Sequence, residues 1–404
     1  MRILHLISQK PDFTGSGTIY KQLSSQSTKA NPQFLLYGTN YEDDVMNFNT
    51  SNVDCFVFDI DKLGFSMPGM SDSMPYKTSK FKDLTLNDLT EYKNIISKKL
   101  NFIINQFKPD IIWSHHLWIL SSIASKTKNK IPQIAFCHGS DLLQHIKCKE
   151  ISKHIKSSLL NIDEIILNSP NQINDVIKIF KPKTTKFIGI PVNEHLFNIK
   201  EKIISNGIYK MVYAGKISKE KGVHFLIKST IRLLEEGYNI ELILYGKGEA
   251  VEMEKIKKLA IEYKGNIIFG GYLSQIELSK ELNKSQIFIL PSFYEGLGLV
   301  IVEALLCGCR VVCNRLNNLF DILSEEVFSR GYIEYVDMNL SINDSIRENY
   351  DEYSQKLEKI ILKQIEKPYS LEIANDINKS VSQFTFKSYY QKLINISKNL
   401  INEN

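Results

Sequence analysis

The stretch Pro291-Ser-Phe-Tyr-Glu-Gly-Leu-Gly-Leu-Val-Ile-Val-Glu303 predicts a glycine turn that leads from a strand into a helix. The apolar run Ile287–Leu290 precedes it and indicates a short buried strand, because a proline and a serine bound the run. Gly296 and Gly298 then allow a sharp turn whose amides no side chain covers. Apolar residues recur at helical spacing over Leu299–Gly308, and the final glycine is typical of a helix end.

Two glutamates of this stretch suit a phosphorylated, polyhydroxylated ligand. Glu295 is predicted in the turn, and Glu303 about one turn inside the helix. Unpaired N–H groups at a helix N-terminus attract phosphate, and a carboxylate accepts hydrogen bonds from sugar hydroxyls. On these residues alone, a structural turn with a solvated glutamate explains the pattern equally well.

Composition indicates a globular chain. Its 404 residues are 43% hydrophobic and 24% charged, which is ordinary and long enough for two domains. No apolar span is long enough for a transmembrane helix, and the first residues suit a core strand better than a signal peptide. Six scattered cysteines lack the spacing of a disulfide framework, which favours a reducing cytoplasm. The cluster Cys307, Cys309 and Cys313 suits small side chains at a tight turn better than zinc or redox chemistry.

Positive charge is concentrated in one part of the chain. The formal net charge is +5, and Lys126–Lys156 holds seven lysines and only two acidic residues. One interpretation is contact with an anionic membrane surface or an anionic acceptor, and a solvated helix face is the other. Nucleic acid binding is not predicted, because the lysines do not alternate with aromatic residues and no recognised nucleic-acid-binding module appears.

Strand and helix patterns alternate along the chain, which indicates α/β domains with parallel, doubly wound sheets. Residues 191–208 are predicted to link two such halves. The irregular segment Asp61–Phe81 is predicted either as a functional loop or as an insertion without a role. Strands are predicted at Arg2–Ser8, Phe34–Tyr37, Val53–Ile60, Pro109–Trp113, Gln133–Phe136, Glu164–Leu167, Phe187–Ile190, Lys210–Ala214, Ile240–Tyr245 and Ile267–Phe269. Helices are predicted at Leu89–Phe107, Gln275–Asn283, Leu357–Ile365 and Phe384–Asn395. Two further helices are predicted, one that begins near Thr18 and another that ends at Leu234.

Polar residues follow two strands of the first half, in Ser114-His-His116 and Cys137-His-Gly-Ser-Asp141. Ligands of open parallel sheets bind at the carboxyl ends of strands, so we expect His138 and Asp141 to contact substrate hydroxyls. For both histidines of the first segment, packing or capping is an equally good interpretation. A fixed set of metal ligands is missing, so no metal site is predicted.

Glycines and lysines follow other strands. Gly15-Ser-Gly17 can bring amides to a phosphate or a sugar. Tyr20 replaces the third glycine of the dinucleotide fingerprint, which disfavours nicotinamide binding. Lys216 and Lys221 flank a helix start and suit a diphosphate, although surface lysines are the default interpretation. Gly246-Lys-Gly248 ends the next strand.

The order and spacing of these motifs resemble glycosyltransferase family 4, whose members are retaining enzymes of the GT-B fold. The resemblance covers about Met1–Cys313 and the terminal helix, and the pair Glu295 and Glu303 is its strongest motif. Ala214–Gly222 looks like the family's diphosphate-binding segment. The resemblance implies an α/β fold with two Rossmann-like doubly wound domains facing a central cleft, and a C-terminal helix that crosses back. The expected domains are 1–195 on the acceptor side, 196–375 for the nucleotide-sugar donor, and 376–404 for the helix packed on the N-terminal domain.

The same resemblance implies roles for single residues. Lys221 would bind the donor diphosphate, aided by Lys216, which stands where the family usually has Arg. Glu303 would hold the ribose hydroxyls, Glu295 those of the donor sugar, and His138 would touch that sugar near the reacting carbon. The expected catalytic residues are His138, Lys221 and Glu295, and the expected substrate-binding residues are Gly15, Gly17, His116, Asp141, Lys216, Gly246, Gly248, Gly296, Leu297, Gly298, Leu299 and Glu303.

The implied reaction moves a hexose or N-acetylhexosamine from a nucleotide diphosphate sugar to a hydroxyl acceptor, with retained configuration. UDP is the expected nucleotide because the family uses it often, and glycan, glycolipid or small glycoside synthesis is the expected setting. No metal or other cofactor is implied. Arg315–Phe320 departs from the family's glycine-containing turn, so contacts to the base are not predicted.

Two other interpretations stay open. One is a non-catalytic sugar-nucleotide-binding subunit of a glycosyltransferase complex, and the other, more distant, is a Rossmann-type oxidoreductase. A cytoplasmic location is expected, with peripheral contact at the inner membrane face through the basic N-terminal domain as a further prediction. The acceptor, the linkage and the oligomeric state are not predicted from the sequence.

Overall fold

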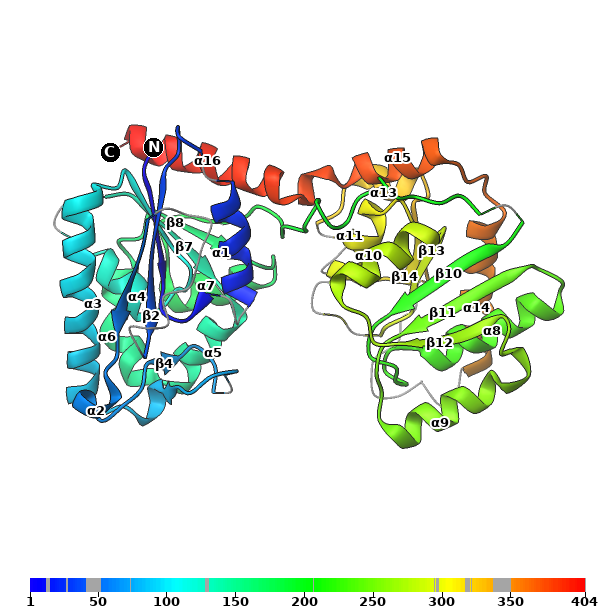
Figure 1. Ribbon diagram of the computed structural model, residues 1–404, viewed down its shortest axis with the longest axis horizontal. Coiled ribbons are helices and arrows are strands. Elements are labelled where there is room, and N and C mark those ends of the chain that lie inside the picture. The colour runs from blue at the N-terminus through cyan, green and yellow to red at the C-terminus, as the bar shows by residue number, and fades with distance from the viewer. Residues whose placement is uncertain are drawn as a thin grey trace. The chain divides into compact units, whose positions relative to one another are not determined.

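The computed structural model (Figure 1) describes residues 1–11, 15–26, 28–40, 52–72, 74–127, 131–205, 207–293, 295, 298–316, 320, 322–336 and 350–403. The chain divides into two compact units. The N-terminal unit comprises Met1–Pro191 and Phe386–Asn404, and the C-terminal unit comprises Val192–Thr385.

These divisions differ from the expected boundaries at 195 and 375. Position 375 lies inside helix α15 (Leu371–Ser380), which belongs to the C-terminal unit, and only α16 (Phe386–Glu403) belongs to the N-terminal unit. The break between the two helices is a 3-10 turn at Ser382–Phe384 that contains neither proline nor glycine. The sequence therefore lacks the residues that usually mark such a break.

The N-terminal unit contains a seven-stranded parallel sheet in the order β3-β2-β1-β6-β7-β8-β9. Its strands are β1 (Ile3–Ile7), β2 (Gln33–Thr39), β3 (Val53–Val57), β6 (Ile111–Ser114), β7 (Gln133–Cys137), β8 (Glu164–Leu167) and β9 (Thr185–Phe187). Its helices, besides α16, are α1 (Gly15–Ser25), α2 (Ile60–Leu63), α3 (Leu86–Phe107), α4 (Ile119–Ala124), α5 (Gly139–Lys147), α6 (Lys149–Leu159) and α7 (Gln172–Phe180), with a 3-10 turn at Phe81–Asp83.

Both faces of this sheet are covered, because alternate residues of a strand point to opposite sides. Leu4 and Leu6 of β1 join a core that also contains apolar residues of α3, α4, α6 and α7. Ile3 and Trp113 point the other way and pack with residues of α1 and α16. Figure 1 shows α16, in red, beside α1 on this side. Both faces of the parallel sheet are thus covered by helices, as is usual for such sheets.

The described residues of the segment Asp61–Phe81, predicted as a functional loop or as an insertion without a role, pack into the unit. The segment contains the short parallel strands β4 (Pro68–Gly69) and β5 (Ser79–Lys80). Met67 and Met70 are 0% and 2% exposed and belong to the core that also contains apolar residues of α3. The segment therefore supplies apolar packing that its lack of periodicity did not reveal.

The C-terminal unit contains a six-stranded parallel sheet in the order β12-β11-β10-β13-β14-β15, with one continuous core. Its strands are β10 (Tyr209–Ala214), β11 (Ile240–Tyr245), β12 (Ile267–Gly271), β13 (Ile287–Leu290), β14 (Arg310–Asn314) and β15 (Ile333–Val336). Its helices, besides α15, are α8 (Val223–Glu235), α9 (Ala250–Leu259), α10 (Gln275–Lys284), α11 (Leu299–Leu306), α13 (Glu325–Ser329) and α14 (Tyr350–Ile365), with 3-10 turns at Ile261–Tyr263 and Ser382–Phe384.

The predicted strands overlap strands of the structure, and their bounds are the same or differ by a few residues. Glu164–Leu167, Ile240–Tyr245 and Ile287–Leu290 have the predicted bounds. The strand predicted at Phe187–Ile190 instead occupies Thr185–Phe187, where it pairs with β8. Among the described helices, none combines the length and the apolar character needed to cross a membrane.

Candidate active site

The carboxyl ends of β6 and β7 place two histidines at one edge of the N-terminal sheet. His116 follows β6, and His138 follows β7 as the N-cap of α5. Nδ1 of His116 lies 2.8 Å from Oδ1 of Asp141, and its Nε2 lies 3.1 Å from Nε2 of Gln9, which follows β1. His116 and Asp141 are 3% and 0% exposed. A buried network therefore holds this edge of the sheet.

Asp141 joins the network through both carboxylate oxygens. Oδ2 accepts hydrogen bonds from the backbone N–H groups of Leu117 and His138, each at 2.9 Å. Burial would raise the pKa of this carboxyl, but the charge and hydrogen bond of His116, together with His138, outweigh burial and lower it. Asp141 therefore stays ionised. Protein groups thus contact both carboxylate oxygens, and the contact with substrate hydroxyls expected of Asp141 stays a prediction.

His138 presents an unsatisfied ring nitrogen. Its Nδ1 lies 2.6 Å from Nδ2 of Asn168, which follows β8, and its Nε2 is buried without a hydrogen-bond partner among the described residues. Burial, with a smaller effect of His116, lowers the pKa of His138 to about 4, so the ring is neutral near pH 7. When the Asn168 amide donates to Nδ1, the ring proton is on Nε2. His138 thus offers a hydrogen-bond donor to a ligand.

Asn168 was not predicted as a site residue. It follows a parallel strand directly, as the two histidines do. The rule that ligands bind at the carboxyl ends of strands could therefore have identified it.

His115 belongs to the core instead. Its Nε2 lies 3.0 Å from Nδ1 of His5, and its ring stacks on Phe136 at a centroid distance of 4.9 Å. Burial lowers the pKa of both histidines, to about 3 for His5. Of the two interpretations, packing is confirmed for His115. Within the described ranges, no group of three His, Cys, Asp or Glu side chains is arranged to hold a metal ion.

Gly15 and Gly17 lie in the first turn of α1, whereas a loop up to Thr18 was predicted. Glycine is costly in a helix interior, which is why the prediction started the helix later. In the first turn the N–H groups have no intrahelical partner anyway. The phosphate contact expected of these two amides stays a prediction.

In the C-terminal unit, two predicted residues form an ion pair. Nζ of Lys221 lies 2.7 Å from Oε1 of Glu295, and the side chains are 24% and 21% exposed. Lys221 stands just before α8, and Glu295 stands between β13 and α11. Both helices follow strands of one parallel sheet, so their N-termini lie at the same edge. The pair therefore lies close to N–H groups that can bind an anion.

Glycines let the backbones of three loops approach each other at this edge. Gly246, after β11, has φ +145°, and a Cβ atom there would lie 1.7 Å from the carbonyl oxygen of Gly215. Gly222, the N-cap of α8, has φ +68°, and a Cβ atom there would lie 2.2 Å from the carbonyl oxygen of Pro291. At Gly248 a Cβ atom would lie 2.2 Å from the carbonyl oxygen of Ile217. No larger residue fits these positions without a backbone shift.

Glu303 lies in the second turn of α11, which Gly298 caps and Leu299 begins. Burial raises the pKa of Glu303 to about 7, and no cation of the described chain forms an ion pair with it. Lys216 is exposed after β10, and its carbonyl accepts a hydrogen bond from the Tyr213 hydroxyl at 2.6 Å. The remaining predicted residues, Gly296 and Leu297, lie outside the described residues.

Comparisons with known proteins agree with this architecture. The family model described as "Glycosyl transferase 4-like" matches residues 66–169, and that described as "Glycosyl transferases group 1" matches residues 197–366. An uncharacterized glycosyltransferase of Methanocaldococcus jannaschii is 23% identical over 57% of this chain and 64% of its own length.

Two solved structures have a similar fold. Sucrose-phosphate synthase from Thermosynechococcus elongatus superposes with a TM-score of 0.60 at 14% identity, over 100% of both chains. HepE from Anabaena, solved in complex with UDP, has a TM-score of 0.59 at 16% identity over 99% of this chain and 100% of its own. The fold is therefore GT-B. The chain belongs to the glycosyltransferases of the family 4 type.

Proposed function

We propose that the protein transfers a hexose or N-acetylhexosamine from a nucleotide diphosphate sugar to a hydroxyl acceptor, with retained configuration. The observation that carries this proposal is the pair Lys221 and Glu295, 2.7 Å apart at the edge where α8 and α11 begin. A cation, a carboxylate and helix N-termini are the groups that a sugar diphosphate needs. UDP is the first candidate nucleotide, because HepE holds UDP in a similar fold.

The Lys221 ammonium that pairs with Glu295 is also the group that a donor diphosphate would contact. A donor diphosphate carries more negative charge than a single carboxylate, so it competes with Glu295 for the Lys221 ammonium. Glu295 is then released to accept hydrogen bonds from hydroxyls of the donor sugar. Lys216, exposed after β10, adds a second cation. Binding thus replaces one ion pair by a stronger one.

Glu303 is proposed to hold the ribose hydroxyls. Burial raises the pKa of Glu303 to about 7. The ionised carboxylate is a strong hydrogen-bond acceptor that is largely shielded from water. Two ribose hydroxyls would supply the donors that water provides elsewhere. In the N-terminal unit, the Nε2–H of His138 is a donor for a sugar hydroxyl.

In the proposed reaction, the groups of the protein and of the donor carry every step, and no metal or other cofactor takes part. The bond between the anomeric carbon and the diphosphate oxygen breaks, and a bond from that carbon to the acceptor oxygen forms on the same face. The acceptor proton passes to a phosphate oxygen of the leaving group. Lys216, Lys221 and amides at the helix N-termini stabilise the charge that develops on the diphosphate. Glycan, glycolipid and small glycoside acceptors all satisfy this scheme.

The direct test is nucleotide release from UDP-, GDP- and ADP-sugars with a panel of hydroxyl acceptors. We expect turnover with one nucleotide class, and a product whose anomeric configuration, read by NMR, matches the donor. Lys221→Ala should lower kcat/KM by roughly 100-fold or more, because a charge-assisted contact to the leaving group is lost. The exposed Lys258, in the last turn of α9, supplies the control, and Lys258→Ala should leave turnover nearly unchanged.

Two outcomes would contradict the proposal. Wild-type turnover in Lys221→Ala and in Glu303→Ala would remove the assigned site. Tight nucleotide binding without release or transfer, across the acceptor panel, would favour the non-catalytic subunit instead.

A further inference from the structure

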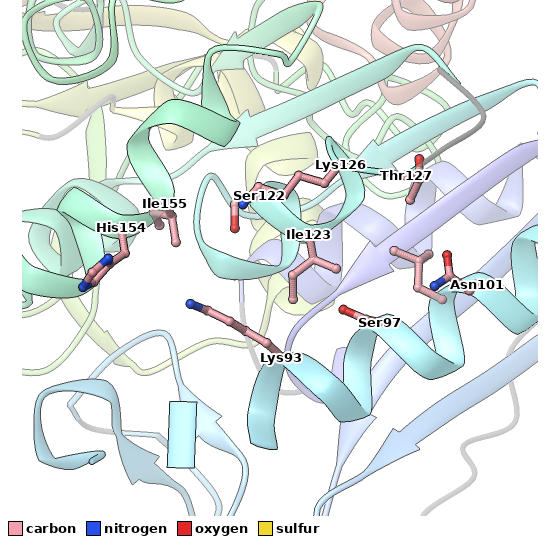
Figure 2. A pocket seen from close by; sticks show the side chains of 10 residues that line it. Lys93, Ser97, Asn101, Ser122, Ile123, Lys126, Thr127, His154 and Ile155 are labelled. Atoms are coloured by element: carbon pink, nitrogen blue, oxygen red, sulfur yellow. The ribbon is translucent and has the colours of Figure 1, made fainter. Parts of the chain in front are cut away.

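A pocket lies in the N-terminal unit among α3, α4 and α6, apart from the histidine network described above (Figure 2). Its volume is about 230 Å³. One water molecule occupies roughly 30 Å³ in the liquid, so the pocket has room for a small ligand. In Figure 2, Lys93 extends from α3 into the space between the helix that carries His154 and the segment that carries Ser122.

The titratable side chains that line this pocket are all basic. They are Lys93, Lys126 and His154, and no carboxylate lines it among the described residues. Glu150 stands one turn before His154 on α6 but is not part of the lining. Burial and then the charge of Lys126 lower the pKa of Lys93. Lys126 therefore destabilises the charged form of Lys93.

Several other lysines of this unit have carboxylate partners. Lys99, on α3, lies 2.7 Å from Asp54, and Lys147 lies 2.6 Å from Asp72. Neither Lys93 nor Lys126 forms an ion pair with a carboxylate of the described chain. The pocket thus holds positive charge that the described protein does not neutralise.

Hydrogen-bonding side chains complete the lining. Ser97 and Asn101 follow Lys93 at successive intervals of four residues on α3, so the three side chains share one helix face. Thr127, just beyond α4, contributes a hydroxyl. Cations together with hydroxyl and amide donors are what a multi-oxygen anion requires.

We propose that this pocket binds a phosphoryl anion, supplied by a free phosphate compound or by the headgroup of an anionic lipid. Phosphate carries several acceptor oxygens that Lys93, Lys126 and the neighbouring donors can satisfy together. The inference does not rest on the proposed transferase activity, because binding is measured without any nucleotide sugar.

The first experiment titrates inorganic phosphate and glycerol 3-phosphate into the full chain by calorimetry at low salt. We expect saturable binding, weakened roughly three- to tenfold by Lys93→Gln or Lys126→Gln, since each substitution removes one charged contact. The control is Lys98→Gln, an exposed lysine of α3 that does not line the pocket. Binding that is absent, or that Lys98→Gln weakens as much as Lys93→Gln does, overturns the proposal.

The second experiment separates the two sources of phosphate. Vesicles of phosphatidylcholine with and without phosphatidylglycerol are sedimented with each variant. Sedimentation that requires phosphatidylglycerol, and that the two pocket variants lose while Lys98→Gln keeps it, assigns the lipid headgroup. Calorimetric binding without lysine-dependent sedimentation assigns a free phosphate compound.

Discussion

The two sheets of this protein carry different kinds of side chains and loops at the carboxyl ends of their strands. In the N-terminal unit, His116, Asp141 and His138 form a buried network whose polar atoms contact mainly other protein groups. In the C-terminal unit, loops held close together by glycines and the half-buried pair Lys221 and Glu295 lie at the same edge of the sheet. The first edge uses side-chain hydrogen bonds to fix one histidine, and the second leaves charge and backbone exposed to a ligand.

This difference implies a division of labour. A substitution in the buried network should first cost stability of the N-terminal unit. A substitution of the ion pair should first cost ligand binding. Because the chain has two units, stability is best followed by hydrogen exchange of each unit, with thermal unfolding as a second measure.

The largest loss of stability is expected for Asp141→Ala. This substitution leaves His116 and two backbone N–H groups without their buried partner. Breaking such a pair typically costs about 3–5 kcal/mol. Hydrogen exchange should accelerate in β7 and α5, while the exposed Glu150→Ala leaves it unchanged. Equal exchange rates in Asp141→Ala and Glu150→Ala would show that the buried network does not stabilise the N-terminal unit.

A smaller loss is expected for Gly246→Ala in the C-terminal unit. The new Cβ would lie 1.7 Å from the Gly215 carbonyl oxygen at φ +145°. The backbone must shift to remove this clash, and alanine is strained at this φ, so the free energy of unfolding should fall by about 2 kcal/mol. Gly265→Ala is the matched control, because nothing lies within 4 Å of its added Cβ. Similar melting temperatures for the two variants would show that the loops are not held together as described.

Glu303 should make the C-terminal unit less stable as pH rises. Its folded pKa, about 7, exceeds the ordinary value of 4.5, so between these values the folded state binds more protons than the unfolded state. Stability therefore falls as pH rises through this window, and Glu303→Gln should be more stable than wild type by about 2 kcal/mol at pH 8. The difference should vanish at pH 4. Urea unfolding at the two pH values measures it, and a difference independent of pH would contradict the burial of this carboxyl.

The smallest effect on stability is expected for Lys221→Ala. Its ion pair with Glu295 is partly exposed, and such pairs contribute less than about 1 kcal/mol. The same variant should lose most nucleotide release, as described above. If Lys221→Ala instead loses much stability, and turnover falls only as far as the loss of folded protein explains, the ion pair has a structural role. The C-terminal pair would then resemble the buried network of the N-terminal unit.

Local sequence signals predicted most of the fold. Apolar runs such as Ile240–Tyr245 and Ile287–Leu290 are buried strands of a parallel sheet and have clear breaks on both sides. The start of α1 at Gly15 was missed, because glycine there disfavours a helix by propensity alone. The segment Asp61–Phe81 was also missed, since its methionines are buried by packing and not by a periodic pattern.

The sequence predicted which residues belong to the site, but it did not predict which of them contact each other. Both glutamates of the opening stretch were identified, yet the pairing of Glu295 with Lys221 joins residues 74 positions apart and depends on how strands are ordered in the sheet. Asp141 was placed at the right edge, but its two oxygens are occupied by groups that the sequence does not bring near it. Sequence spacing therefore locates a site more reliably than it assigns the role of each residue.

Helix α16 has a consequence for how the chain folds during synthesis. It returns to the N-terminal unit after the whole C-terminal unit, and it brings Ser397 to the buried indole of Trp113 at 3.1 Å and Leu393 to the core. The part of this sheet face that α16 covers, next to α1, therefore stays exposed until α16 leaves the ribosome. The C-terminal unit, which is contiguous in sequence, can finish folding first. On a translating ribosome, the half that is made first is thus the half completed last.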